Sequence, residues 1–460
     1  MLSQTQRLGT ESPGKLLFKL SLPAIAAQIV NLAYNLVDRM YIGNIPGTGQ
    51  AALTGMGVCL PLIMLITAFS NLVSMGGAPR ASIFFGKGDQ QNARHTMANC
   101  LTMLLVFSAV LTTVFLLFPR PLLLLFGASE NTIDYAVDYM SIYATGTVFV
   151  QLTLGMNAFI TAQGFARTGM FTVIIGAALN IALDPIFIFV FDLGVRGAAI
   201  ATVISQAVSA AWVLMFLSGK KATLKLCPSL MRLKASIILP CLALGLSPFI
   251  MGATESVLNV CFNTSLLKYG GDIAVCTMTV LSSVMQLAML PLHGLTQGSQ
   301  PIISFNYGAG DSGRCKRTFR LLLICCVTYS AVFGITAICV PEMFIKLFNS
   351  DPDLIAFAVP AMRIYMAACA IFGMQIACQQ TFIALGNAKS SLFLALLRKV
   401  FLLIPLIYIL PALLENKTNA VFLAEPTADI IAVTTTVILF SVQFSKAMKE
   451  LDKKNTIQGV

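Results

Sequence analysis

The stretch PRASIFFGKGD at residues 79–89 returns as PIISFNYGAGD at residues 301–311, 222 positions later. The proline, the serine, two glycines and the aspartate fall on the same residue type in both copies. Without a gap, the same offset relates Pro119 to Pro341 and Gly164 to Gly386, and it holds over about ninety residues. One constant offset over such a length predicts that the chain consists of two copies of one structural unit.

The amino-acid composition indicates whether these copies fold in water or in a membrane. The chain is 57% hydrophobic and 11% charged, whereas roughly a quarter of an ordinary soluble domain is charged. The apolar residues fall in blocks of about 20 to 25, the length at which a helix spans a bilayer. We therefore expect an all-α polytopic membrane protein. The net charge of +11 does not indicate a nucleic-acid partner, because no basic stretch is interleaved with aromatic residues.

The apolar blocks predict twelve transmembrane helices, six in each copy. The spans run near residues 16–41, 51–76, 95–118, 133–157, 165–190, 197–218, 237–265, 274–298, 317–341, 355–380, 391–412 and 424–445. We expect two pseudo-symmetric six-helix bundles that form a central cleft. The predicted domains are an N-lobe at 1–218, a cytoplasmic linker at 219–236 and a C-lobe at 237–460. Pro426 is expected near the start of the last helix.

The distribution of Lys and Arg predicts the orientation. With a cytoplasmic N-terminus, the inside tails and loops hold 21 of these residues and the outside loops hold five. This imbalance follows the positive-inside rule, so both termini are expected in the cytoplasm. Six spans per copy make the repeats parallel, a layout typical of one class of secondary transporters, whose binding site lies near the midplane between the halves.

Polar residues inside the spans are the first candidates for function, because burying them in lipid costs free energy. Gln28, Asn31, Asn35 and Asp38 are spaced by 3, 4 and 3 residues, which places them on one helical face. Amides also serve as hydrogen-bonding links between helices. The carboxylate favours a functional stripe, and the alternative is that Asp38 only neutralises Arg39.

The fifth span adds Asn180 and Asp184, one turn apart, with Pro185 next. Proline frees a backbone carbonyl one turn earlier. Two carboxylates, an amide oxygen and a free carbonyl are ligands for a hard cation such as Na⁺, so Asp38, Asn180 and Asp184 are the predicted metal ligands. The same carboxylates could carry H⁺ instead. Thr202 in the sixth span could add a hydroxyl, or bond only to its own helix.

The second half has a different pattern. Glu255 in the seventh span maps by the offset onto position 33, so each half presents an acid from its first helix. Asp184 maps onto Leu406, and a cation site is therefore expected in the first half only. Glu255 would contact substrate or a proton, or form a structural ion pair, with Arg363 as a possible partner. Asn157, Tyr139 and Gln286 could line the cleft with Asn35, although helix-to-helix hydrogen bonds are equally consistent with them.

Three runs carry a family resemblance: NLVDRMYIG at 35–43, MLPLHGLTQGSQPIISFNYGAG at 289–310 and ALGNAK at 384–389. They resemble the multidrug and toxic compound extrusion (MATE) transporters, in the branch of bacterial multidrug exporters related to the DNA-damage-inducible type. The resemblance covers essentially the whole chain. It implies two six-helix lobes in the bacterial inner membrane that export cytoplasmic drugs in exchange for Na⁺ or H⁺.

The resemblance also implies roles for particular residues. Asp38, Asn180, Asp184 and Thr202 match the family's cation site, and Glu255 resembles the C-lobe acid of several members. The acid that those members carry in the tenth span is absent, which puts a second cation site in doubt.

The expected function is therefore secondary efflux of lipophilic organic cations by a monomer, with no cofactor beyond the coupling ion. A flippase of lipid-linked precursors is the alternative, supported only by Arg39 and Arg363. An enzyme is not expected, because the spans contain no HExxH motif, no GxSxG motif and no paired His or Cys cluster.

Overall fold

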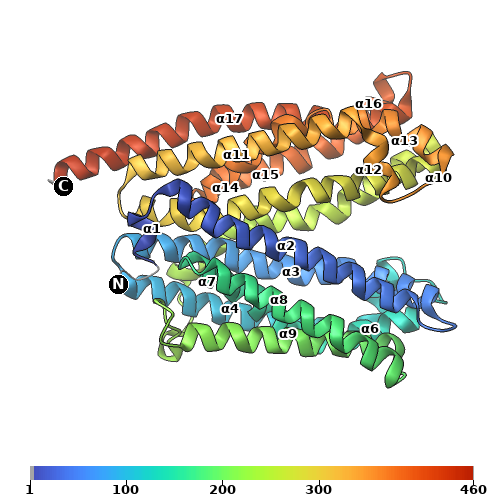
Figure 1. The fold of residues 1–460 in the computed structure, drawn as a ribbon, viewed down its shortest axis with the longest axis horizontal. Helices are drawn as coiled ribbons and strands as arrows, with labels where there is room; N and C mark the ends of the chain where they lie inside the picture. Colours follow the sequence, from blue (N-terminus) through green and yellow to red (C-terminus); the bar gives the residue numbers. More distant parts are fainter. Residues whose placement is uncertain (1–4, 459–460) are drawn as a thin grey trace. The chain divides into compact units, whose positions relative to one another are not determined.

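The computed structural model describes residues 5–458, and every regular element in that range is helical (Figure 1). Residues 1–4 and 459–460 of the predicted lobes lie outside the described residues. The elements are α1 (Arg7–Thr10), α2 (Pro13–Gly43), α3 (Gly49–Gly86), α4 (Gln90–Leu117), α5 (Pro119–Leu125), α6 (Ile133–Thr145), α7 (Thr147–Ala162), α8 (Ala166–Pro185), η1 (Ile186–Val190), α9 (Gly194–Ser218), η2 (Pro228–Leu230), α10 (Ala235–Gly308), α11 (Ser312–Cys339), α12 (Pro341–Lys346), α13 (Pro352–Tyr365), α14 (Cys369–Ala384), α15 (Ala388–Leu396), η3 (Leu397–Leu403), α16 (Ile404–Leu413) and α17 (Lys417–Gln458). The predicted all-α class is confirmed.

The described helices account for twelve spans. Nine are long and apolar enough to cross a membrane, and the pair α13 and α14, bent by 48°, makes ten. The long element α10 holds two helices that meet at Gly271, where φ is 68° and ψ is −164°. The apolar helix α7 follows α6 across the single residue Gly146. Counting α10 as two spans and α6 with α7 as one brings the ten to the twelve predicted.

The repeat is visible in the local structure as well as in the sequence. Helices α4 and α11 begin 222 residues apart, and so do α7 and α14. Asp89 and Asp311 each cap the helix that follows, accepting a backbone N–H three residues on at 3.0 and 2.8 Å. Before them, Gly88 and Gly310 have φ of 79° and 82°, a conformation that glycine adopts without strain. The two copies therefore share turn geometry.

Two compact units divide the chain differently from the predicted domains. The first unit comprises Leu22–Gly245 with the residues up to Thr10, and the second comprises Glu11–Ser21 with the residues from Leu246 onward. The predicted linker at 219–236 thus belongs to the first unit, as do the first turns of α10. The first turns of α2 belong to the second unit.

Close backbone contacts explain this exchange of helix ends. A Cβ atom on Gly76 of α3 would lie 1.8 Å from the carbonyl oxygen of Cys241 in α10. A Cβ atom on Gly298, which is 222 residues after Gly76, would lie 2.5 Å from the backbone nitrogen of Ser21 in α2. Glycine permits both approaches because it has no side chain. Each unit therefore holds the first turns of a helix whose remainder belongs to the other unit.

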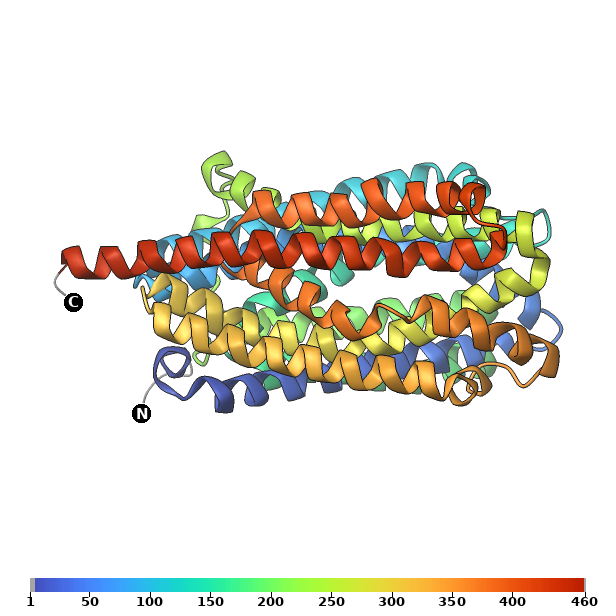
Figure 2. The same ribbon diagram turned by 90° about the horizontal axis from the view of Figure 1, so that it is seen from above.

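Each unit has its own apolar core. In the first, α3 packs against α4, α6 and α7, and α8 packs against α9, around buried side chains such as Ile66 and Phe115. In the second, α11 packs against α14, and α17 packs against α14 and α16 (Figures 1 and 2). The core there includes Leu403 and Phe422.

The last helix begins earlier than expected. It starts at Lys417, because Asn416 caps it by accepting the backbone N–H of Asn419 at 3.1 Å. Pro426 therefore lies inside α17 and does not mark its start, so the expectation for that residue was wrong. The same shift places Glu425 and Asp429 inside the helix, where both are buried.

Candidate functional site

Four polar side chains of the first unit meet where three helices pack together. Asp38 comes from α2, Asn180 and Asp184 from α8, and Thr202 from α9, and each is at most 8% exposed. Asn180 Nδ2 donates to Asp184 Oδ1 at 3.1 Å and to Thr202 Oγ1 at 3.3 Å. Thr202 also donates to the carbonyl of Ala198 at 3.0 Å, so it bonds to its own helix and to the cluster.

The carboxyl groups of Asp38 and Asp184 lie within hydrogen-bonding reach of each other. Two carboxylates so close in a buried site repel unless a proton or a cation lies between them. Within the described residues, Asp38 Oδ1, Asn180 Oδ1 and Asp184 Oδ2 are buried without a hydrogen-bond partner. Unpartnered buried oxygens are rare, because leaving them unsatisfied costs free energy. The arrangement of these oxygens can therefore accept a positive charge.

The donor set fits a hard cation. Carboxylate, amide and hydroxyl oxygens are the ligands that such ions take in proteins. Softer transition metals prefer His and Cys ligands, and the described residues contain no cluster of three or more His, Cys, Asp or Glu side chains that could hold a metal. Na⁺ or H⁺ at Asp38, Asn180 and Asp184 is consistent with these atoms.

The backbone is irregular next to this cluster. Helix α8 ends at Pro185, directly after Asp184, and the chain continues as the π-helical segment η1. Proline lacks an N–H and interrupts the helical hydrogen bonds. Single π-helical turns inside α-helices are frequent at functional sites. Asp184 is thus carried by a helix whose regular bonding stops beside it.

Aromatic side chains surround Asp38. Tyr34, one turn earlier on α2, lies close enough to both carboxylates to interact with them electrostatically. Tyr139 and Tyr143 also lie near Asp38, with their rings stacked at a centroid distance of 5.9 Å. Tyr139 is 2% exposed and packs in the apolar core of the first unit, so it does not line an open cleft. Tyr34 was missed from sequence, although its spacing of four from Asp38 indicates the shared face.

Of the other residues predicted for a substrate cleft, two make hydrogen bonds to backbone carbonyls and one is exposed. Asn35 donates to the carbonyl of Asn31 at 2.7 Å. Asn157 links α7 to α8, donating to the carbonyl of Gly169 at 3.2 Å and accepting from Thr172. Gln286 is exposed on α10.

A second charged cluster lies in the second unit, on helices equivalent by the repeat to those of the first site. Arg398 in η3 donates through Nε to Asp429 at 2.6 Å and through Nη2 to Glu425 at 2.8 Å, both in α17. The next residue, Lys399, donates to Glu255 in α10 at 2.8 Å.

The sequence had suggested Arg363 as a possible ion-pair partner of Glu255. The structure instead pairs Glu255 with Lys399. Arg363 is exposed on α13, and its Nε reaches the carbonyl of Ile338 at 3.3 Å. Sequence reasoning overlooked Arg398 and Lys399, although two adjacent cations inside an apolar span are a signal of the kind that identified Asp184.

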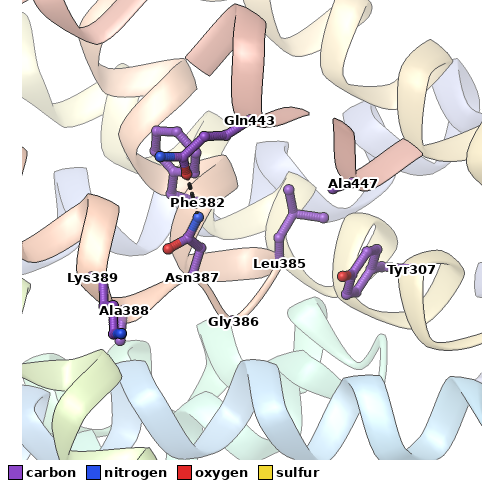
Figure 3. A pocket seen from close by; sticks show the side chains of 9 residues that line it. All are labelled: Tyr307, Phe382, Leu385, Gly386, Asn387, Ala388, Lys389, Gln443 and Ala447. Atoms are coloured by element: carbon purple, nitrogen blue, oxygen red, sulfur yellow. Dashed lines mark hydrogen bonds between the residues drawn. The ribbon is translucent and has the colours of Figure 1, made fainter. Parts of the chain in front are cut away.

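The second unit also has a cavity of about 470 Å³ (Figure 3). Its lining includes no residue of the Asp38–Asp184 cluster or of the Arg398–Lys399 cluster. It is lined by Tyr307, Phe382, Leu385, Gly386, Asn387, Ala388, Lys389, Gln443 and Ala447. Asn387 caps α15 by accepting the N–H of Ser390 at 3.2 Å and donates to Gln443 at 2.6 Å. The run ALGNAK thus joins α14 to α15, with Gly386 at φ of 77° in the turn.

Comparison with known proteins gives consistent matches over most of the chain. A family model described as MatE matches residues 23–186 and 249–409. Multidrug export protein MepA of Staphylococcus haemolyticus is 24% identical, over 87% of this chain and 87% of its own. The protein of the same name from Staphylococcus saprophyticus is 22% identical, over 85% and 86%.

Solved structures agree with the fold. A MATE structure in the bent conformation has a TM-score of 0.91 at 20% identity and covers 98% of this chain and 100% of that chain. An outward-facing multidrug resistance MATE family transporter of the MOP superfamily has a TM-score of 0.89 at 20% identity, covering 96% and 98%.

Proposed function

Because the chain belongs to the MatE family, we propose that it is a secondary transporter that exports lipophilic organic cations in exchange for Na⁺ or H⁺. The names of the relatives, multidrug export proteins, support the efflux of small organic compounds. The acidic balance of Asp38, Asp184 and Glu255 supports a preference for cations. The flippase alternative is not retained, since the related proteins are named for multidrug export.

The observation that carries the proposal is the trio of unpartnered oxygens at Asp38, Asn180 and Asp184. Two unit charges about 4 Å apart repel by about 4 kcal/mol at an effective dielectric constant near 20. An ion or proton that removes this repulsion favours whichever conformation brings the two carboxylates together. Coupling requires only that the ion binds one conformation more tightly than the other.

We further propose that the protein acts as a monomer in the bacterial inner membrane with both termini in the cytoplasm. The count of 21 inside and five outside Lys and Arg supports this orientation. Efflux then proceeds from the side on which the basic loops lie, while the coupling ion enters from the opposite side down its gradient.

The test is drug-stimulated ion flux in proteoliposomes, with Na⁺ and pH gradients imposed separately. Asp184→Asn should abolish gradient-driven efflux while the protein still folds, because the amide keeps the shape but loses the charge. The matched control is Asp138→Asn in the same unit. Asp138 is a half-exposed acid that pairs with Arg196 at 2.9 Å outside the site, and its loss should leave efflux intact. Full gradient-driven transport by Asp184→Asn would refute a coupling role for this residue.

A further inference from the structure

The ion pairs made by Arg398 and by Lys399 differ sharply in burial. The side chains of Arg398, Glu425 and Asp429 are 3% to 7% exposed. Lys399 is 9% exposed, but its partner Glu255 is 52% exposed. The pairs made by Arg398 are thus buried on both sides. The pair made by Lys399 joins a buried ammonium to an accessible carboxylate.

Glu255 lies at a depth where lipid is an unfavourable neighbour for a carboxylate. The residue lies 20 positions into α10, a helix apolar enough to span the membrane. Ionisable groups at such depth face the bundle interior or a water-filled cavity and avoid lipid. A solute that reaches the exposed side of Glu255 from water therefore meets a carboxylate whose charge is already balanced by Lys399.

Arg398 and Lys399 are suited to different tasks. Arg398 makes two charge-assisted bonds from its planar guanidinium and lies 4.5 Å from the ring centroid of Phe372, so it is fixed on several sides. Lys399 is a point charge on a flexible four-carbon stem, with a single described bond to a carboxylate. Lys399 can withdraw from Glu255 without disturbing the bonds of Arg398.

We propose that Lys399 is a built-in competitor for organic cations at Glu255. In the free protein its ammonium occupies the carboxylate, and a monovalent lipophilic cation must displace it to bind there. This inference rests on the proposed export of organic cations and adds a residue that sets affinity and release. The ammonium returns to Glu255 as the ligand leaves, which prevents the acid from retaining its cargo.

The measurement is ethidium binding to the purified full-length protein, followed by fluorescence, together with the concentration dependence of efflux in proteoliposomes. Lys399→Gln should tighten ethidium binding about fivefold, the size of a partly exposed ion pair. The same variant should lower both the apparent KM and the maximal rate of efflux, because release slows. Lys399→Arg, which keeps a positive charge next to Glu255, should not tighten ethidium binding.

The matched control is Lys346→Gln in the same unit, where Lys346 pairs with Glu342 at 3.0 Å on the surface. Its ethidium affinity should equal that of wild type. The inference is overturned if Lys399→Gln binds ethidium no better than Lys346→Gln, or binds it more weakly, which would make Lys399 a positioning group for Glu255. Failure of the proposed function is recognised separately, since wild type itself would then export no cationic dye.

Discussion

Replacing Arg398 by Met should destabilise the protein more than any other single loss of a basic side chain in the second unit. Met preserves most of the volume but removes the guanidinium that bonds to Asp429 at 2.6 Å and to Glu425 at 2.8 Å. Both carboxylates then remain in a site where their side chains are 3% and 7% exposed. Neither acid bonds to the other cation of the cluster, because Lys399 donates to Glu255.

The magnitude follows from this burial. Removing one partner of a buried ion pair typically costs about 3 to 5 kcal/mol, because the remaining charge stays in a medium of low polarity. Protonation of one of the two acids would limit the loss, so we expect about 3 kcal/mol. The surface variant Lys346→Met, which breaks a pair with both side chains more than half exposed, should cost at most about 1 kcal/mol.

The assay is reversible unfolding of the purified protein in mixed detergent micelles, followed by circular dichroism. A triple variant in which Arg398→Met is combined with Glu425→Gln and Asp429→Asn should recover most of the lost stability, since no buried charge is left. A loss below about 1 kcal/mol for Arg398→Met would show that the acids have another counter-ion. A triple variant no more stable than the single one would place the loss in packing against Phe372.

Two further predictions concern transport. Glu255→Gln should weaken the export of cationic dyes and spare neutral compounds, measured as efflux from cells that lack their own pumps; equal loss of both classes would assign Glu255 to coupling or to structure. Leu406→Met should keep efflux near wild type, because Leu406 packs against the apolar core of the second unit and carries no charge. Loss of coupling in Leu406→Met, as expected for Asp184→Asn, would contradict a cation site confined to the first unit.

The fold was largely predictable because its determinants are periodic and repeated. Apolar blocks of bilayer length define the helices, and the offset of 222 residues carries turn signals such as Gly88 with Asp89 into the second half. The unit boundaries were not predictable in this way. They depend on close approaches such as that of Gly76 to Cys241, between helices distant in sequence, and no local pattern reports such a contact.

One charged cluster could be predicted from the sequence and the other could not. Asp38 and Asp184 were identifiable because an acid in an apolar span costs free energy that needs a reason. The set formed by Arg398, Glu425 and Asp429 was missed because the last span was expected to begin near residue 424, which puts both acids in its first turns. The helix in fact begins at Lys417. An error of about two turns at the start of one helix therefore hid two buried acids that bond to Arg398.

The distribution of charge supports our proposal that coupling resides in one unit only. The clusters use equivalent helices: α2, α8 with η1, and α9 in the first unit, and α10, α15 with η3, and α17 in the second. Among the described residues of the first unit, no cationic side chain bonds to either carboxylate, although Arg39 acts on Asp38 at longer range, and three oxygens stay unpartnered. In the second unit, the positive charge belongs to the side chain of Arg398 and is therefore part of the protein.

A tethered cation cannot be exchanged between the two sides of a membrane, so it can hold a structure but cannot transmit a gradient. Only a site whose counter-ion comes from solution changes its free energy with the ion concentration on one side. If the proposed function holds, we expect the free energy of the ion gradient to enter through Asp38 and Asp184, and Lys399 to change only the binding of organic cations at Glu255.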